Sequence, residues 1–404
     1  MENTPKASRL HIAIFGRRNV GKSSLINAIT NQNIALVSPV AGTTADPVYK
    51  AMEIPPIGPV MLIDTAGIDD EGELGLLRVE KTMQVLNKTD MAILVTDAQI
   101  DFDEYENNLI ESIRKHSLPL IGVANKSDLS DITDKDWQLY QEKFDNKVIK
   151  ASAKTGEGID ELKQLIIKNA PNDFESAPIL GDLINGDIVV LVTPIDSAAP
   201  KGRLILPQNQ AIRDALDHDA CCIVVKEGQL KTALENLINP PGLVVTDSQE
   251  FKKVSEIVPQ GIPLTSFSIL YARHKGDLKK LVTGAQAIDC LKTGDKVLIA
   301  EACTHHCQAA DIGRVKIPRL LTQHINGKLE FEWSAGGNFP TLSGVKKYNL
   351  IVHCGACMLS RREMLYRIAL ASDASVDIVN YGVLISKILG ILPRVLKPFR
   401  IDIE

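Results

Sequence analysis

The sequence lacks a long apolar run. Its most apolar late stretch, residues 382–392, is eleven residues long and is interrupted by Ser386 and Lys387. A helix that crosses a bilayer needs about 18 or more predominantly apolar residues. We therefore expect no segment of this chain to cross a membrane.

The sequence also lacks a strong excess of charge of either sign. Lysine and arginine total 45, aspartate and glutamate total 50, and the formal net charge is −5. That balance is too mild for a chain whose whole surface coats a nucleic acid or an anionic membrane. Apolar residues at 45% and charged residues at 24% are ordinary for a folded globular protein, which excludes a disordered or fibrous chain.

An apolar secretory core is missing from the first ten residues, MENTPKASRL. We therefore expect the chain to stay in the cytoplasm, where thiols remain reduced. In that compartment the seven cysteines are expected to serve as free thiols or metal ligands.

The length of 404 residues predicts two or three domains at about 150 residues each. In the first 170 residues, short apolar runs alternate with helical patterns, which predicts an α/β fold with a doubly wound parallel sheet. The expected strands lie at residues 10–15, 60–63, 91–96, 120–124 and 148–151.

A glycine-rich segment separates the first expected strand from the helix that begins near Lys22. Residues 16–23 read GRRNVGKS, which fits the phosphate-loop pattern G-x-x-x-x-G-K-[ST] in its strand, loop and helix context. Backbone N–H groups there can surround phosphate oxygens, Lys22 can reach the outer phosphates, and the Ser23 hydroxyl can ligate magnesium. The expected nucleotide-binding residues of this segment are Asn19, Val20, Gly21, Lys22, Ser23 and Ser24.

Three further segments follow in the order that a guanine nucleotide site requires. Residues 64–67, DTAG, place Asp64 at a strand end to hold magnesium and Gly67 where its N–H meets a γ-phosphate. In NKSD, residues 125–128, the carboxylate of Asp128 can accept hydrogen bonds from N1–H and the 2-amino group of guanine, a pair that adenine does not offer. The remaining expected base-binding residues are Asn125, Lys126, Ser152, Ala153 and Lys154, and the expected nucleotide is GTP.

This first segment resembles the translation-factor-related GTPases of the branch that contains Era, Der and MnmE. The resemblance implies that Thr44, or its neighbour Thr43, joins the magnesium shell from the first switch. Ile68 stands where Ras-like proteins carry a water-orienting glutamine, so hydrolysis is expected to be slow. Asn19 matches the residue that helps to coordinate potassium in MnmE-like members, although a loop-capping asparagine is the alternative.

A linker is expected around residues 168–178, where Pro171 and Pro178 punctuate a stretch with few apolar residues. A second alternating pattern follows, with strands expected at 188–192, 222–225 and 243–246. It contains no glycine fingerprint and no tandem of histidine and nucleophile. We expect it to be structural, with a role in self-association.

The third segment carries cysteines and histidines after two expected strands. CTHHC, residues 303–307, follows the strand at 296–300, and HCGAC, residues 353–357, follows the strand at 348–352. If both strands lie parallel in one sheet, both clusters fall at its carboxyl edge. Zinc would be satisfied by three cysteines and one histidine, whereas an iron–sulfur cluster would take the three thiolates; the residues alone leave both open.

The whole chain resembles the HydF family, the GTPase scaffolds of FeFe-hydrogenase maturation. The resemblance is carried by a GTPase followed by Cys-x-His, a spacer of 47 residues and His-Cys-x-x-Cys. It implies a GTPase domain at 1–170, a dimerisation domain at 178–267 and an iron–sulfur domain at 268–404. The implied cluster ligands are Cys303, Cys354 and Cys357, with His305 and His353 as nearby or exchangeable ligands; Cys307 departs from the pattern and leaves the fourth ligand open.

The same resemblance implies the cofactors and partners. The protein would bind GTP, Mg²⁺, K⁺ and a 4Fe-4S cluster, accept a transient diiron precursor, and deliver it to apo FeFe-hydrogenase. Radical-SAM maturation enzymes and a second copy of the chain would be partners, whereas nucleic acid and membranes would not. The alternative is an RNA or ribosome assembly GTPase with a structural zinc site, which the mildly acidic charge disfavours.

Overall fold

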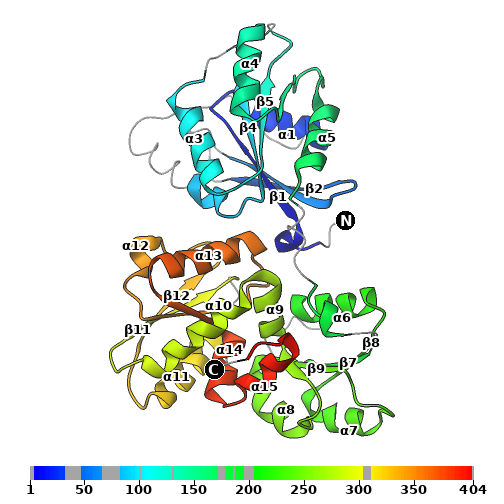
Figure 1. Cartoon of the computed structure of the whole chain (residues 1–404), viewed down its shortest axis with the longest axis vertical. Helices are drawn as coiled ribbons and strands as arrows, with labels where there is room; N and C mark the ends of the chain where they lie inside the picture. Colours follow the sequence, from blue (N-terminus) through cyan, green and yellow to red (C-terminus); the bar gives the residue numbers. More distant parts are fainter. Residues whose placement is uncertain are drawn as a thin grey trace. The chain divides into compact units, whose positions relative to one another are not determined.

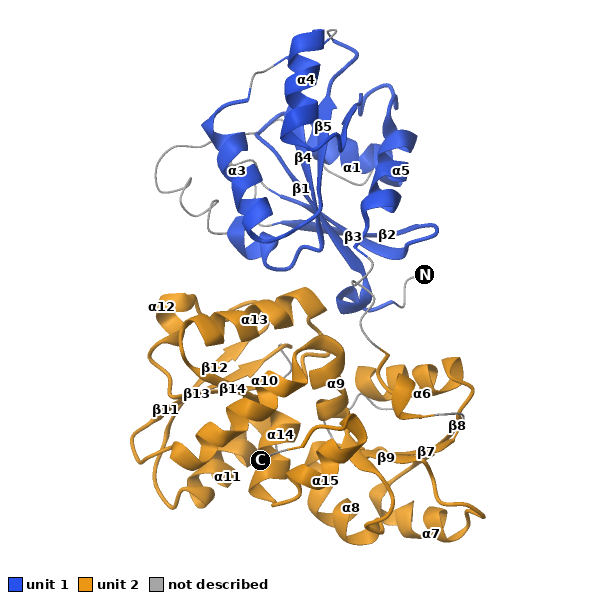
Figure 2. Cartoon of the chain, viewed as in Figure 1, with its two compact units in different colours: residues 1–175 blue, residues 176–404 orange. Residues whose placement is uncertain are grey.

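The computed structural model of the chain describes residues 4–31, 47–65, 82–99, 102–129, 132–171, 178–184, 187–194, 204–303 and 311–402. The chain separates into two compact units, residues 1–175 and 176–404 (Figure 2). Each unit is described by itself below.

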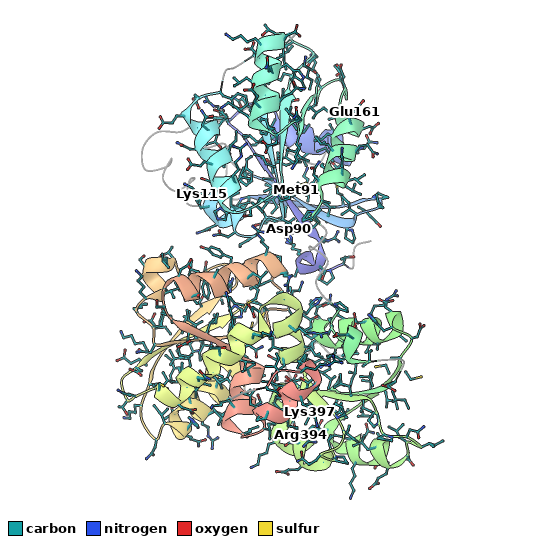
Figure 3. All side chains as sticks on the ribbon, viewed as in Figure 1. Asp90, Met91, Lys115, Glu161, Arg394 and Lys397 are labelled. Atoms are coloured by element: carbon teal, nitrogen blue, oxygen red, sulfur yellow. The ribbon has the colours of Figure 1, made fainter. Side chains whose placement is uncertain are left out.

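The first unit is built on a six-stranded sheet with the order β2-β3-β1-β4-β5-β6 (Figure 1). Only β2 runs antiparallel to its neighbour among these strands. Asp90 and Met91, labelled in Figure 3, mark the amino end of β4, the edge opposite the phosphate loop. The strands are β1 (Leu10–Phe15), β2 (Val48–Ile54), β3 (Gly58–Asp64), β4 (Met91–Asp97), β5 (Leu120–Asn125) and β6 (Val148–Lys150).

Helices cover both faces of this sheet because successive strand residues point to opposite sides. Ile12 and Ile14 pack with α1 (Lys22–Thr30) and α5 (Ile159–Asn169), whereas Ala13 and Phe15 pack on the other face. That second face is covered by α3 (Glu104–Lys115) and α4 (Asp134–Lys143), as Figure 1 shows. The arrangement leaves the carboxyl ends of the parallel strands open for loops that bind a ligand.

The second unit contains two four-stranded parallel sheets. The first has the order β10-β9-β7-β8 and the second the order β12-β11-β13-β14. Their strands are β7 (Ile188–Val192), β8 (Cys221–Val225), β9 (Leu243–Thr246), β10 (Leu264–Ser266), β11 (Lys296–Glu301), β12 (Glu330–Ala335), β13 (Leu350–His353) and β14 (Asp377–Asn380).

The helices of the second unit are α6 (Leu206–Asp217), α7 (Leu230–Glu235), α8 (Phe251–Ile257), α9 (Phe267–Lys275), α10 (Leu278–Thr283), α11 (Ile317–His324), α12 (Leu342–Val345), α13 (Arg361–Asp373), α14 (Tyr381–Ile388) and α15 (Leu392–Leu396). One continuous apolar core joins the two sheets, since Val190 and Val244 of one sheet share it with Ile299, Ile351 and Val379 of the other. The sheet of β7–β10 and the sheet of β11–β14 therefore pack as one compact unit.

The expected fold class is confirmed: a phosphate-loop domain with a doubly wound sheet is followed by two smaller parallel α/β sheets. The expected boundaries at 170, 178 and 267–268 stay a prediction. Among the residues described, no helix has the length and apolar character needed to span a bilayer.

Candidate functional site

The phosphate loop turns sharply from β1 into α1. Gly16 and Gly21 have φ of 146° and 95°, and Gly21 is the residue before the first turn of α1. A β-carbon on Gly16 would collide with the carbonyl oxygen of Val95, and one on Gly21 with the side-chain nitrogen of Asn125. Both positions therefore need glycine for space as well as for conformation.

Lys22 lies inside this loop, with 8% of the residue exposed. Its Nζ donates to the carbonyl oxygens of Gly16 at 2.8 Å and Arg17 at 2.6 Å. Backbone carbonyl oxygens thus hold the Lys22 ammonium on the inside of the loop. The N–H groups of the same loop are expected to face the phosphates. Ser24 follows within α1, and Asn19 has a left-handed φ of 61°.

The expected magnesium residues Ser23 and Asp64 are in contact. The Ser23 hydroxyl donates to Oδ2 of Asp64 at 2.6 Å. Burial raises the pKa of Asp64, while the Ser23 hydrogen bond and the positive charges of Lys22 and Lys50 oppose that rise. A carboxylate that is partly desolvated beside a hydroxyl is a suitable oxygen pair for a hard cation.

Four residues of the expected switches lie outside the described residues: Thr43, Thr44, Gly67 and Ile68. Their expected roles in binding magnesium, in contacting the γ-phosphate and in slowing hydrolysis stay predictions.

Asn125 connects the phosphate loop to the expected base-binding loops. Its Nδ2 donates to the Val20 carbonyl at 2.7 Å, and its Oδ1 accepts from the Ala153 N–H at 3.1 Å. The side chain is buried, so these two bonds fix three segments that are far apart in the sequence. The sequence motif suggested a residue near the base, and the structure shows it joining the loops.

Asp128 is held by Ser152, whose hydroxyl donates to Oδ1 at 2.7 Å. Ser152 is fully buried, whereas Asp128 is exposed and accessible to a ligand. Lys126 has a left-handed φ of 65° and forms an ion pair with Asp97 at 2.6 Å. Ser152, Ala153 and Lys154 follow β6 in the turn that precedes α5.

Two supports of this site were not anticipated from the sequence. Asp97 ends β4 and pairs with Lys126. Arg17 donates to Glu106 of α3 at 2.5 and 2.9 Å and pairs with Asp103, and these acids raise the pKa of the guanidinium. Both pairs join residues that are distant in the chain, and no local pattern marks them.

Cys303 and Cys354 follow the same edge of the sheet of β11–β14, as expected from a parallel pair. The register of β11 and β13 places Ala300 opposite His353, so Cys303 and Cys354 both follow the same edge. The Ala302 N–H donates to Sγ of Cys354 at 3.1 Å, and the Cys354 N–H donates to the Ala300 carbonyl at 2.9 Å. The loop after β13 is therefore fastened to the end of β11.

Burial raises the pKa of the Cys354 thiol to about 12, with further increases from the nearby Cys357 and Cys303 thiols. Burial likewise raises the pKa of Cys357 to about 11; Cys303 adds to the rise and the positive charge of Lys275 opposes it. The three sulfurs are close enough to repel one another as thiolates. Without a cation, at least Cys354 and Cys357 stay protonated at neutral pH, and a bound metal ion would reverse that preference.

These three thiols are the soft donors that iron–sulfur clusters and zinc take, so their chemistry fits the expected group. Within the described residues, however, no group of three Cys, His, Asp or Glu side chains already stands in a ligating arrangement. His305 and Cys307 lie outside the described residues, and their roles stay predictions.

His353 is buried completely, and both of its ring nitrogens have partners. Nδ1 lies 2.8 Å from the Cys354 carbonyl oxygen, and Nε2 lies 3.1 Å from Nη1 of Arg367. Burial and the Arg367 charge lower the pKa of His353 to about 3, against the opposing hydrogen bond to Cys354. The imidazole is therefore neutral at physiological pH.

Both units of the chain match known protein families. Residues 179–276 match the hydrogen maturase F dimerization domain, and residues 279–398 match the hydrogen maturase F tetramerization domain. These two matches together cover more than half of the chain and adjoin each other.

The chain belongs to the hydrogen maturase F (HydF) family. Residues 11–126 match the family described as the 50S ribosome-binding GTPase, so the first unit of this HydF chain holds a GTPase domain. The expected resemblances to HydF and to the GTPase branch are both confirmed. The part expected to bind a cluster, residues 268–404, overlaps the match described as a tetramerization domain.

Individual relatives are similar to the GTPase part. GTPase Der of Wolinella succinogenes is 35% identical over 182 residues, which is 42% of this chain and 38% of that protein. The tRNA modification GTPase MnmE of Aquifex aeolicus is 36% identical over 168 residues, 41% of this chain and 36% of that protein. The HydF chain thus spans less than two fifths of the length of these relatives.

Among solved structures, a variant of Aquifex aeolicus Era bound to GDP and AlF4⁻ is 29% identical to this chain. The match covers 40% of this chain and 57% of that one, with a TM-score of 0.36.

Proposed function

We propose that this HydF chain is a GTP-binding scaffold and carrier. It holds a 4Fe-4S cluster, accepts a diiron precursor as cargo and delivers it to apo FeFe-hydrogenase, while slow GTP hydrolysis regulates its partner interactions. The domains in this proposal are a GTPase domain at 1–170, a dimerisation domain at 178–267 and a cluster domain at 268–404.

The observation that supports the proposal is that Cys303, after β11, and Cys354, after β13, lie at the same edge of one sheet. The chain that carries them matches two domains of the HydF family. Cys303, Cys354 and Cys357 would hold the cluster, which supplies an iron that no cysteine ligates. The Ala302 N–H stabilises negative charge on Cys354. Three protein thiolates leave one coordination position for incoming cargo, a position that a fourth cysteine such as Cys307 would close.

The GTPase part would act on partner exchange. Lys22 and the loop N–H groups bind the phosphates, Ser23 and Asp64 bind Mg²⁺ together with Thr44, and Asp128 selects guanine. Asn19 would bind K⁺, which supplies positive charge near the phosphates. The proposed nucleotide site also includes Val20, Gly21, Ser24, Gly67, Asn125, Lys126, Ser152, Ala153 and Lys154.

The proposed partners are apo FeFe-hydrogenase, radical-SAM maturation enzymes and a second copy of the chain. The matches to a dimerization and a tetramerization domain support self-association. The proposed location is the cytoplasm, since a carrier with free thiols needs a reducing compartment.

The proposal is tested by anaerobic purification followed by iron, sulfide and zinc analysis. About four iron and four sulfide per chain are expected. Alanine variants of Cys303, Cys354 and Cys357 should each lose the cluster, whereas Cys221→Ala, which changes an exposed cysteine on β8, should keep it. One zinc per chain without sulfide would contradict the proposal and favour the alternative function, an RNA or ribosome assembly GTPase with a structural zinc site.

A further inference from the structure

The contacts of His353 determine which of its nitrogens carries the proton. A guanidinium has only N–H donors and no acceptor, so Nε2 must accept the hydrogen bond from Nη1 of Arg367 at 3.1 Å. The single proton of the neutral ring then lies on Nδ1. That N–H donates to the Cys354 carbonyl oxygen at 2.8 Å.

Arg367 is fixed from several directions. The residue is 1% exposed, and its Nη2 donates to the Gly336 carbonyl at 2.6 Å and to Oε1 of Glu363 at 2.7 Å. Its guanidinium also lies over the Phe339 ring, 4.9 Å from the ring centre. A side chain tied to the loop after β12 and to its own helix α13 cannot turn away from His353 without breaking these contacts.

Cys354 is held through both of its backbone polar groups. Its N–H donates to the Ala300 carbonyl at 2.9 Å, and its own carbonyl accepts from His353. With both peptide planes fixed, the direction of the Cα–Cβ bond of Cys354 is set as well. The turn continues through Ala356, whose φ of 57° is left-handed, to Cys357.

We propose that Arg367 is a positioning residue for the cysteine site. It holds His353 as the Nδ1–H tautomer, His353 anchors the Cys354 carbonyl, and the anchored turn presents Cys354 and Cys357 together. His353 then ligates no metal, because its only lone pair is occupied by Arg367. The inference rests on the proposed function for the identity of the bound cluster, but the Arg367–His353 contact involves only residues of this chain and is measured without the cluster.

The tautomer is measured on the full-length, metal-free protein labelled with ¹⁵N-histidine. Two-dimensional NMR of the ring nitrogens, with His353→Asn to assign the signals among eight histidines, should show His353 protonated on Nδ1 alone. Arg367→Lys should change that pattern, since one ammonium cannot replace the forked donors. Arg362→Lys, on the same helix α13, should leave it unchanged. A His353 protonated on Nε2 would overturn the inference.

The effect on the site is measured after anaerobic reconstitution. His353→Asn keeps an N–H donor near the Nδ1 position, whereas His353→Gln places its amide near Nε2 and removes that donor. Iron loss to a chelator should therefore be about 10- to 100-fold faster in His353→Gln and Arg367→Lys than in the wild type, with His353→Asn closer to the wild type. Equal rates in all three variants and the wild type would contradict the positioning role.

Ligation is measured separately by pulsed electron paramagnetic resonance of the reduced, ¹⁵N-histidine-labelled protein. Wild type and His353→Asn should show the same nitrogen couplings. A coupling that disappears in His353→Asn would make His353 a ligand and end the inference. If the purified wild-type protein contained no iron and no sulfide, the proposed function would be wrong. The NMR experiment would still test the Arg367–His353 contact, so the two failures can be told apart.

Discussion

Asp128→Asn should convert the nucleotide preference of the first domain from GTP to xanthosine triphosphate. The carboxylate accepts from two guanine donors, and each charge-assisted bond contributes about 1.5–3 kcal/mol. The amide keeps one acceptor oxygen and replaces the other with a donor, so one of these bonds is lost and GTP affinity should decrease by about 10- to 10²-fold. Xanthine carries a carbonyl in place of the 2-amino group, so the amide NH2 of the variant side chain gains a partner.

The structure explains why the replaced side chain should keep its orientation. The buried Ser152 donates to Oδ1 of Asp128 at 2.7 Å, and the same bond can hold the amide oxygen, which turns the NH2 toward the base. The assay is titration calorimetry with GTP and xanthosine triphosphate, and Asp134→Asn, an exposed change at the start of α4, serves as the control. An unchanged GTP affinity in Asp128→Asn would show that Asp128 does not read the base.

Further outcomes follow from the same two sites. Lys22→Ala should weaken GTP binding without changing iron content, since the two sites lie in different units of the chain; loss of iron would contradict this separation. Hydrolysis should be faster in potassium than in sodium, and equal rates would refute the role of Asn19. Cys307→Ser should leave the cluster spectrum unchanged, whereas a labile cluster would show Cys307 to be the fourth ligand. Burial raises the pKa of Cys354 to about 12. The neutral thiol therefore stabilises the protein without its cluster below about pH 8.5, and this stabilisation is lost as the pH rises toward 12. In urea unfolding, the free energy of unfolding should decrease less over this pH range in Cys354→Ala than in the wild type, whereas Cys221→Ala should behave like the wild type.

Those parts of the fold that depend on short-range sequence patterns could be predicted from the sequence. The buried strand β1 and the glycines after it could be predicted because an apolar run, a phosphate loop and a helix start are all short-range signals. The strand β2 was missed because it is mostly exposed, with only Lys50 and Ile54 buried, and it contains no apolar run. The edge strand β12, EFEWSA, was missed because it also contains no apolar run.

In the candidate sites, too, some features could be predicted from the sequence and others depend on contacts between distant residues. The convergence of Cys303 with Cys354 could be predicted, because parallel strands bring their carboxyl ends to one edge. The partners of His353 could not be, since Arg367 reaches it from a helix that starts eight residues later. A motif names the residues of a site, but the tautomer and the supporting ion pairs depend on contacts made only in the folded chain.

The most direct test of the central claim is activation of apo FeFe-hydrogenase by anaerobically purified protein loaded with a diiron precursor. Loaded wild-type protein should activate the hydrogenase. The triple variant that replaces Cys303, Cys354 and Cys357 by alanine should bind GTP normally, contain no cluster and fail to activate. Full activation by that triple variant would contradict the account.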